Sequence, residues 1–196
     1  MPAPTVKAVL ASANPDKVAE IAQLLGGLVE LVGRPDSVGA VEEDADSLLG
    51  NAILKAEAIV EATGEMAIAD DTGLFVAALD GEPGVRSARY ASEHATYEEN
   101  VAALLGAMEG LEDRRAEFRT VAVIAFPDGR RRWVQGMVRG EILTVGAGAD
   151  GFGYDPIFAP LAGKGRSFGQ MTMAEKNRIS HRGAAFAALG SLLALP

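Results

Sequence analysis

The chain has 196 residues and no cysteine, which excludes disulfides, thiolate metal sites and a cysteine nucleophile and fits a reducing cytoplasm. Its formal net charge of −9 argues against a nucleic-acid partner and against an anionic membrane surface. The first residues lack the basic-then-apolar layout of a secretory signal, and no apolar run approaches the roughly 20 residues of a membrane span.

The chain opens with the pattern of a strand, a loop and a helix. Residues 6–11 are expected to form the strand, and apolar residues then recur at helical spacing from Val18 to Leu25. Asn14 is expected to cap this helix, with Pro15 at its first position. The loop Ser12-Ala13-Asn14-Pro15-Asp16-Lys17 therefore directs amides, a hydroxyl and an ammonium toward an anion such as phosphate. A plain capped helix with a solvated lysine is the alternative.

A second strand is expected at 29–32, followed by a long helix from about Ser47 to Thr63. The apolar stripe of that helix is expected to consist of Leu49, Ile53, Ala56 and Val60. Asn51 and Lys55 lie four residues apart on a different side of the helix, so they can act together.

Carboxylates gather before and after this helix. The loop 41–46 contains Glu43 and other acidic residues, and Asp70 and Asp71 directly follow a buried strand expected at 66–69. Ligand sites of α/β proteins gather at the carboxyl ends of strands, and Mg2+ favours a few carboxylates together with water and phosphate oxygens. The alternatives are a hydrated surface loop at 41–46 and a turn-forming role for Asp70 and Asp71.

The second half of the chain continues with helices and a hairpin. A turn is expected at 81–84, and a hairpin is expected to pair 116–126 with 131–139. Capping boxes at 96–99 and 172–175 are each expected to start a helix. A glycine-rich loop is expected at 146–153 and a last helix at about 182–193. Because helices are mixed with both hairpins and crossovers, the chain is predicted to be α/β with a mixed sheet. No separable linker interrupts it.

Two later segments contain aromatic and cationic candidates. In Gly151–Phe158, glycines allow a flat ligand to approach Phe152, and Asp155 is held before a proline. The segment Glu175–Gly183 adds three cationic or donor side chains, Lys176, His181 and Arg182. An ordinary turn with buried aromatic residues and solvated helix cations are the alternatives.

Six of these segments occur in the order found in one known family. They are Ser12–Lys17, Asn51–Ala56, Ala69–Leu74, Pro83–Tyr90, Gly151–Pro156 and Ile179–Gly183. Together they resemble the inosine triphosphatase family, whose members hydrolyse ITP, dITP and XTP. The resemblance extends from about Val6 to Leu193.

The resemblance implies an elongated α/β fold in a single domain of residues 1–196, with a central mixed sheet flanked by helices and two lobes around a nucleotide cleft. It implies a protein that is usually a homodimer and that acts on purine nucleoside triphosphates. It also implies Mg2+-dependent attack of water at the α-phosphorus, with pyrophosphate as the leaving group.

The resemblance also assigns roles to residues. Glu43 and Asp71 would be the metal carboxylates, and Asp71 the general base. The residues implied for the triphosphate are Ser12, Asn14, Lys17, Lys55, Thr72 and Lys176, and those implied for the base are Phe152, Tyr154, Asp155, His181 and Arg182. Ala13, Pro15, Asp16, Asn51 and Gly153 complete the expected substrate-binding segments. Arg182 or backbone donors at the purine 6-position would accept a 6-oxo group and reject adenine.

Four positions depart from the family pattern. Ala13 stands where Gly is frequent, Thr72 where Ser is commoner, Gly50 where Glu is frequent, and Ala77 where Asp is frequent. Thr72 keeps the hydroxyl, and Ala13 is tolerable if its φ is negative. The changes at Gly50 and Ala77 bear on the details of metal ligation.

Two other functions stay open from the sequence. The run Asp70-Asp71-Thr72-Gly73 also suggests a phospho-aspartate phosphatase, although that chemistry typically needs two Asp residues separated by one position. A non-catalytic nucleotide sensor would keep the binding residues without turnover. A pyrophosphatase for modified pyrimidine nucleotides would need a different set of motifs.

Overall fold

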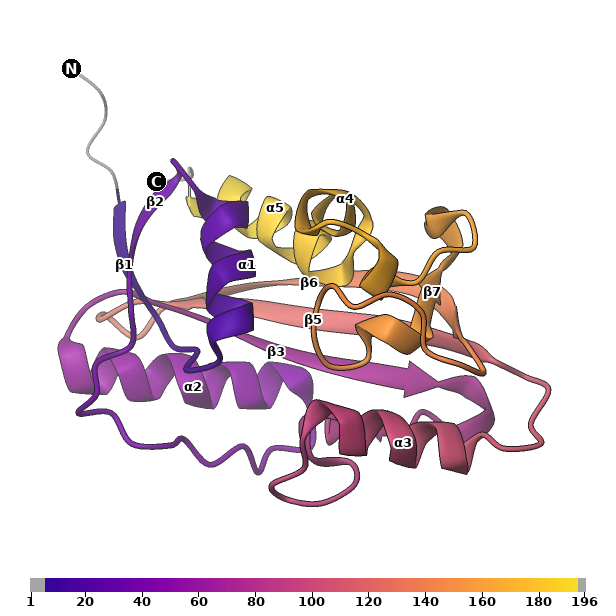
Figure 1. The fold of residues 1–196 in the computed structure, drawn as a ribbon. Coiled ribbons are helices and arrows are strands. Elements are labelled where there is room, and N and C mark those ends of the chain that lie inside the picture. The colour runs from indigo at the N-terminus through magenta and orange to yellow at the C-terminus, as the bar shows by residue number, and fades with distance from the viewer. Residues whose placement is uncertain (1–5, 194–196) are drawn as a thin grey trace. The chain divides into compact units, whose positions relative to one another are not determined.

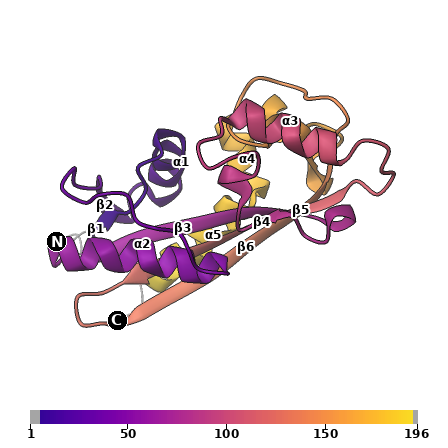
Figure 2. The ribbon, with the colours of Figure 1, turned by 90° about the horizontal axis from the view of Figure 1, so that it is seen from below.

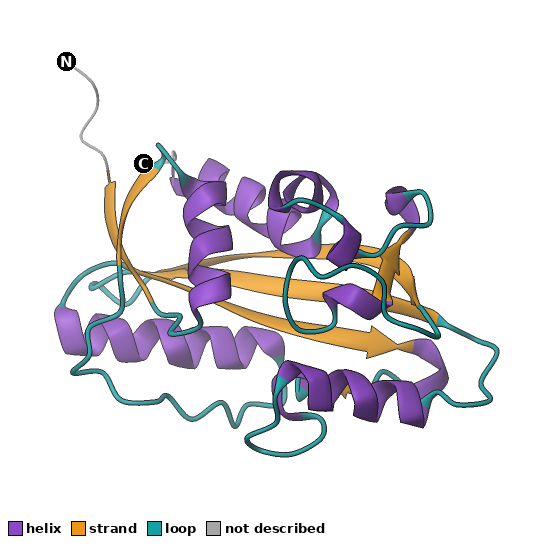
Figure 3. Ribbon diagram, in the orientation of Figure 1, coloured by secondary structure: helices purple, strands orange, loops and turns teal. Residues whose placement is uncertain are grey.

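The computed structural model describes residues 6–193, so residues 1–5, which belong to the segment predicted to lack a secretory signal, lie outside it together with 194–196. Its α-helices are α1 (Pro15–Leu25), α2 (Leu48–Thr63), α3 (Tyr97–Ala107), α4 (Met173–Ile179) and α5 (His181–Leu193). Its strands are β1 (Val6–Leu10), β2 (Val29–Val32), β3 (Ala67–Val76), β4 (Pro83–Gly84), β5 (Arg115–Ala125), β6 (Arg131–Ile142) and β7 (Phe158–Pro160) (Figures 1 and 3). None of the helices within residues 6–193 combines the length and the apolar character that a membrane span requires.

The strands form one mixed sheet, in the order β2-β1-β3-β5-β6-β7, with β4 paired to β3. β1 runs parallel to both β2 and β3, and its register with β3 places Val9 opposite Ala67. The short strands β4 and β7 run antiparallel to β3 and β6. The predicted α/β fold with a mixed sheet flanked by helices is therefore confirmed.

The described chain divides into two compact units. The first unit contains the residues up to Asp71, residues 120–136 and the residues from Arg182 onward. The second unit contains residues 72–119 and 137–181. The strands β3, β5 and β6 each have residues in both units.

In the first unit, helices cover both faces of the sheet. Ile21 of α1 and Phe186 of α5 pack with Ile68 and Ile124 in one apolar cluster, whereas α2 lies on the other face (Figures 1 and 2). The face of α2 that is buried contains Leu48, Asn51, Ala52, Lys55, Ala56 and Ile59. The predicted stripe of α2 is therefore wrong except for Ala56. The buried residues Leu48, Ala52 and Ile59 each come one position before a predicted one, and Asn51 and Lys55 lie on the same buried face.

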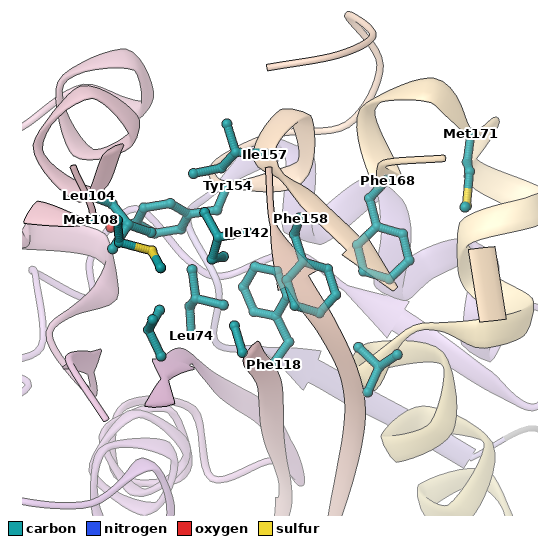
Figure 4. Packing of buried hydrophobic residues seen from close by; sticks show 13 residues of the cluster. Leu74, Leu104, Met108, Phe118, Ile142, Tyr154, Ile157, Phe158, Phe168 and Met171 are labelled. Carbon is teal, nitrogen blue, oxygen red and sulfur yellow. The ribbon is translucent and has the colours of Figure 1, made fainter. Parts of the chain in front are cut away.

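In the second unit, the core is built around aromatic rings in edge and stacked contacts. The ring centroids of Phe118 and Phe158 lie 4.7 Å apart, and those of Phe158 and Phe168 lie 5.4 Å apart (Figure 4). Leu104 and Met108, from α3 and the residue after it, complete this cluster. Offset and edge-to-face contacts of this kind add to the stabilisation that burial gives the rings.

The strand that carries the two aspartates is longer than predicted. β3 continues through Asp70 and Asp71 to Val76, so the prediction that this strand ends at residue 69 is wrong. Gly73 is a strand residue and not a turn residue. A Cβ on residue 73 would lie 2.5 Å from the carbonyl oxygen of Gly84, so the absence of a side chain lets β4 approach β3.

The predicted helix starts and the hairpin are confirmed. Asn14 caps α1 and Pro15 occupies its first position. Both predicted capping boxes, at Thr96 and Thr172, are present at the starts of α3 and α4. β5 and β6 are consecutive neighbours in the sheet, as the predicted hairpin of 116–126 with 131–139 requires. The strands β4 and β7 were not predicted, because two and three residues are too few for an alternating pattern.

Candidate active site

The loop before α1 is fixed by its own side chains. The Asn14 side-chain oxygen accepts hydrogen bonds from the amides of Asp16 at 3.0 Å and Lys17 at 3.3 Å, and the Ser12 hydroxyl accepts one from the amide of Asn14 at 3.2 Å. Ala13 has a negative φ, since within residues 6–193 the only non-glycine residues with positive φ lie elsewhere. The frequent glycine of the family is therefore not needed at this position.

Asp70 and Asp71 have different partners because neighbouring side chains of a strand point to opposite faces of the sheet. Asp70 Oδ2 lies 3.9 Å from Lys17 Nζ and 3.2 Å from Arg182 Nη2, on the face that α1 and α5 cover. Asp71 instead faces α2, where its Oδ1 lies 2.8 Å from Lys55 Nζ. β3 thus presents Asp70 to Lys17 and Arg182 on one face and Asp71 to Lys55 on the other.

Lys55 joins Asp71 to the acidic loop. Its ammonium lies 3.1 Å from Glu43 Oε2 as well as 2.8 Å from Asp71 Oδ1, and we call these three residues the acidic-lysine cluster. Burial acts to lower the pKa of Lys55, but Asp71 and Glu43 outweigh it and hold that pKa above its usual value. Burial raises the pKa of Asp71, while Lys55 and Lys17 offset part of the rise. The resemblance assigns Glu43 and Asp71 to the metal and Lys55 to the triphosphate, and the structure brings these three side chains into contact.

The acidic-lysine cluster fits a magnesium site. Two carboxylates converge on one cationic point, and Mg2+ prefers such hard oxygen ligands while it keeps several waters and phosphate oxygens. A group of three His, Asp or Glu side chains that could hold a metal ion is found neither at this cluster nor elsewhere in residues 6–193. Glu43 and Asp71 would therefore hold a bound Mg2+ together with groups from water and substrate.

Arg182 lies in a buried ionic network with Glu20 and Asp70. Its Nη1 donates to Glu20 Oε2 at 2.6 Å, its Nε donates to Asp70 Oδ2 at 3.3 Å, and its side chain is 1% exposed. Burial alone would raise the pKa of Asp70, but Lys17 and Arg182 lower it to about 2. Burial lowers the pKa of Lys17, and Asp70 opposes that shift.

Sequence reasoning did not identify Glu20. The available signal was a carboxylate on the apolar face of α1, next to Ile21 and three residues after Lys17. Charged side chains are rarely buried without a partner, so this position predicts a buried cation elsewhere in the chain.

In the second unit, Lys176 lies with residues that the resemblance assigns to the base. Its Nζ lies 2.7 Å from Asp155 Oδ2 and 4.6 Å from the ring centroid of Phe152. Asp155 Oδ2 also accepts a hydrogen bond from the amide of Phe152 at 2.9 Å. The structure therefore groups Lys176 with Phe152 and Asp155, although the resemblance assigned this lysine to the triphosphate.

Tyr154 and His181 belong to the packed interior of the second unit. The Tyr154 hydroxyl donates to the carbonyl oxygen of Ser87 at 2.9 Å, and burial raises the pKa of this tyrosine. The His181 ring stacks on Phe118, with 4.5 Å between centroids and 14° between planes. Thr72 is half-buried on β3. A direct contact of these three side chains with a nucleotide stays a prediction.

Comparisons with known proteins find close relatives over nearly the whole chain. Residues 8–192 match the sequence profile described as the Ham1 family. A protein of Deinococcus deserti named dITP/XTP pyrophosphatase is 45% identical over 181 residues, which are 92% of this chain and 86% of the relative. A protein of the same name from Desulforamulus reducens is 46% identical over 185 residues, which are 92% of this chain and 92% of the relative.

A solved structure agrees with the fold. The structure titled a HAM1 protein from Coxiella burnetii superposes with a TM-score of 0.88 at 38% identity. The superposition covers 96% of this chain and 98% of the other. At this identity and coverage, the likeness extends to the sequence as well as the fold.

Proposed function

This chain belongs to the Ham1 family, and from that premise we propose that it hydrolyses the purine nucleoside triphosphates ITP, dITP and XTP to the monophosphate and pyrophosphate. Relatives that bear the name dITP/XTP pyrophosphatase support this reaction, since they match over 92% of this chain. The observation on this chain that carries the proposal is the acidic-lysine cluster. Two converging carboxylates and a buried lysine provide metal ligands, a base and a phosphate partner within one group.

The reaction needs positioning and charge neutralisation, because water and not a protein side chain attacks the phosphorus. A Mg2+ ion held by Glu43 and Asp71 would offset negative charge on the triphosphate. Lys17 and Lys55 bind phosphate oxygens, which offsets the charge of the departing pyrophosphate. Asp71 accepts a proton from the attacking water as the general base.

We assign base recognition to Phe152, Asp155, Lys176 and His181 of the second unit. A ring such as Phe152 offers a flat surface for stacking on a purine, and the Lys176–Asp155 pair offers a donor and an acceptor beside it. Donors at the purine 6-position favour the 6-oxo group of hypoxanthine and xanthine over the amino group of adenine. We further assign the protein to the cytoplasm as a homodimer, in line with its family resemblance and its lack of cysteine.

The proposed function is tested by pyrophosphate release from ITP, XTP, GTP and ATP measured side by side. With Mg2+, we expect fast release from ITP and XTP and release at least tenfold slower from GTP and ATP. With EDTA, release is expected to stop for all four, because the two carboxylates then lack the cation that lets them share the site with a triphosphate. No release from any nucleotide in Mg2+ would reject the proposed reaction.

The same enzyme preparation separates the alternatives. Hydrolysis in 18O-labelled water is expected to place the label in the monophosphate, with no phosphate trapped on Asp71. A trapped acyl-phosphate would favour the phospho-aspartate phosphatase. Tight ITP binding without pyrophosphate release in excess Mg2+ would favour a nucleotide sensor.

The Lys55→Ala variant is expected to raise the KM for ITP at least tenfold, with a smaller change in kcat. The reason is that Lys55 supplies a buried positive charge for the triphosphate. Steady-state kinetics at saturating Mg2+ measure the effect, and circular dichroism verifies that the variant is folded. Lys7→Ala, which removes a half-exposed lysine of the same unit, is the control and should leave both constants unchanged. Unchanged constants in Lys55→Ala would remove this lysine from substrate binding.

A further inference from the structure

Asn51 connects the acidic loop to Asp71. Its side chain is buried, with 1% of the residue exposed, and both ends of its amide are used within the protein. The side-chain oxygen accepts a hydrogen bond from the amide of Ala45 at 3.0 Å, and Nδ2 donates to Asp71 Oδ2 at 3.4 Å. One side chain thus fixes a backbone position of the loop relative to the carboxylate on β3.

Gly50 allows the loop to lie this close to α2. A Cβ on residue 50 would lie 2.6 Å from the Cβ of Ala45, a distance that side chains do not tolerate. The amide of Gly50 donates to the Ser47 hydroxyl at 3.1 Å, so the first turn of α2 is itself fixed. A side chain at residue 50 would therefore have to displace the loop and not the helix.

The position of Glu43 depends on this arrangement. Glu43 comes two residues before Ala45, and its neighbours Glu42 and Asp44 are exposed to solvent. The side chain of Glu43 is 35% exposed, and its carboxylate reaches Lys55 Nζ at 3.1 Å. Since the loop has no regular secondary structure, the hydrogen bond from Ala45 to Asn51 is a contact that holds it against α2.

We propose that Asn51 and Gly50 are positioning residues, which hold the acidic loop so that Glu43 and Asp71 face the same Mg2+ ion. The inference rests on the proposed metal role of those two carboxylates. It changes the role of Asn51 from a substrate ligand to a residue that orients metal ligands. Residues that orient metal ligands typically change metal affinity by about 10- to 100-fold when they are replaced.

The test measures metal binding without turnover. Mn2+ is titrated into the nucleotide-free protein, and the free ion is quantified by electron paramagnetic resonance. We expect Asn51→Ala to raise the Mn2+ dissociation constant at least tenfold. Hydrogen exchange followed by NMR should also show the amide of Ala45 exchanging at least tenfold faster, since it loses its acceptor.

Asn100→Ala provides a matched control in the second unit. Asn100 is also a buried helical asparagine, whose oxygen accepts from the amide of Ala91 at 2.9 Å and whose Nδ2 donates to Ala88 at 3.0 Å. It has no carboxylate partner among these contacts. The control should lose stability in a similar way and leave the Mn2+ dissociation constant unchanged.

Gly50→Ala tests the same loop through a different residue. Alanine favours a helix more than glycine does, so a site that served only the helix would gain thermal stability without a change in metal binding. We expect the Mn2+ dissociation constant to rise severalfold instead, because the new Cβ displaces Ala45. This variant keeps Asn51 and every charged residue, so it addresses the loop even if Asn51→Ala does not fold.

Three outcomes would contradict the inference. These are unchanged Mn2+ binding in the variants at 50 and 51, an equal shift in the Asn100 control, and a wild-type protein that binds no Mn2+. A wild-type protein that binds Mn2+ but releases no pyrophosphate would contradict the proposed function alone.

Discussion

The Asp71→Asn variant is expected to release pyrophosphate from ITP at least a hundredfold more slowly than the wild type, while its affinity for ITP stays nearly the same. Asparagine has almost the same shape as aspartate but cannot accept the proton of the attacking water, and general-base catalysis is typically worth about 10²- to 10⁴-fold. The substitution also removes one of the two carboxylates that we assign to Mg2+. Turnover is measured at saturating Mg2+ and ITP, and affinity by equilibrium dialysis.

Asp128→Asn is the control for this prediction. Asp128 is an exposed carboxylate in the turn between β5 and β6, where it accepts hydrogen bonds from Arg130. Its replacement should leave turnover unchanged. Near wild-type turnover in Asp71→Asn would remove Asp71 from the mechanism and direct attention to another proton acceptor.

The Arg182→Met variant is expected to lose about 3–5 kcal/mol of unfolding free energy, because it removes the guanidinium that pairs with the buried carboxylates of both Glu20 and Asp70. Methionine fills much of the same volume, so the loss reflects charge more than a cavity. Urea denaturation measures it. Arg131→Met, which removes an exposed pair with Glu57, should cost at most about 1 kcal/mol.

The pH dependence of stability gives a second readout of this network. In the wild type the pKa of Asp70 is lowered from 3.8 to about 2, so its contribution is present above pH 3.8 and is lost as the pH falls toward 2. In Arg182→Met, loss of the guanidinium raises that pKa. The difference in stability between the variant and the wild type should therefore become smaller as the pH is lowered through the acid range. A stability loss near that of Arg131→Met would show that the network contributes little.

Local signals in the sequence determined where most helices begin and where the hairpin turns. Asn14 and Pro15 mark the start of α1 because the cap and the first position depend only on neighbouring residues. The capping boxes at Thr96 and Thr172 predicted the starts of α3 and α4 for the same reason. The six motifs, taken in their order along the chain, also resembled the family to which the chain belongs.

Only the tertiary structure decided which partners the charged residues have. Asp70 and Asp71 are adjacent in the sequence, yet β3 directs them to opposite faces, so that Asp70 meets Arg182 from 112 residues away. The burial of Asn51 and Lys55 on the inner face of α2 likewise contradicted the apolar pattern of that helix. A sequence pattern reports the polarity of a side chain, whereas the cost of burying it depends on partners that the folded chain brings from distant positions.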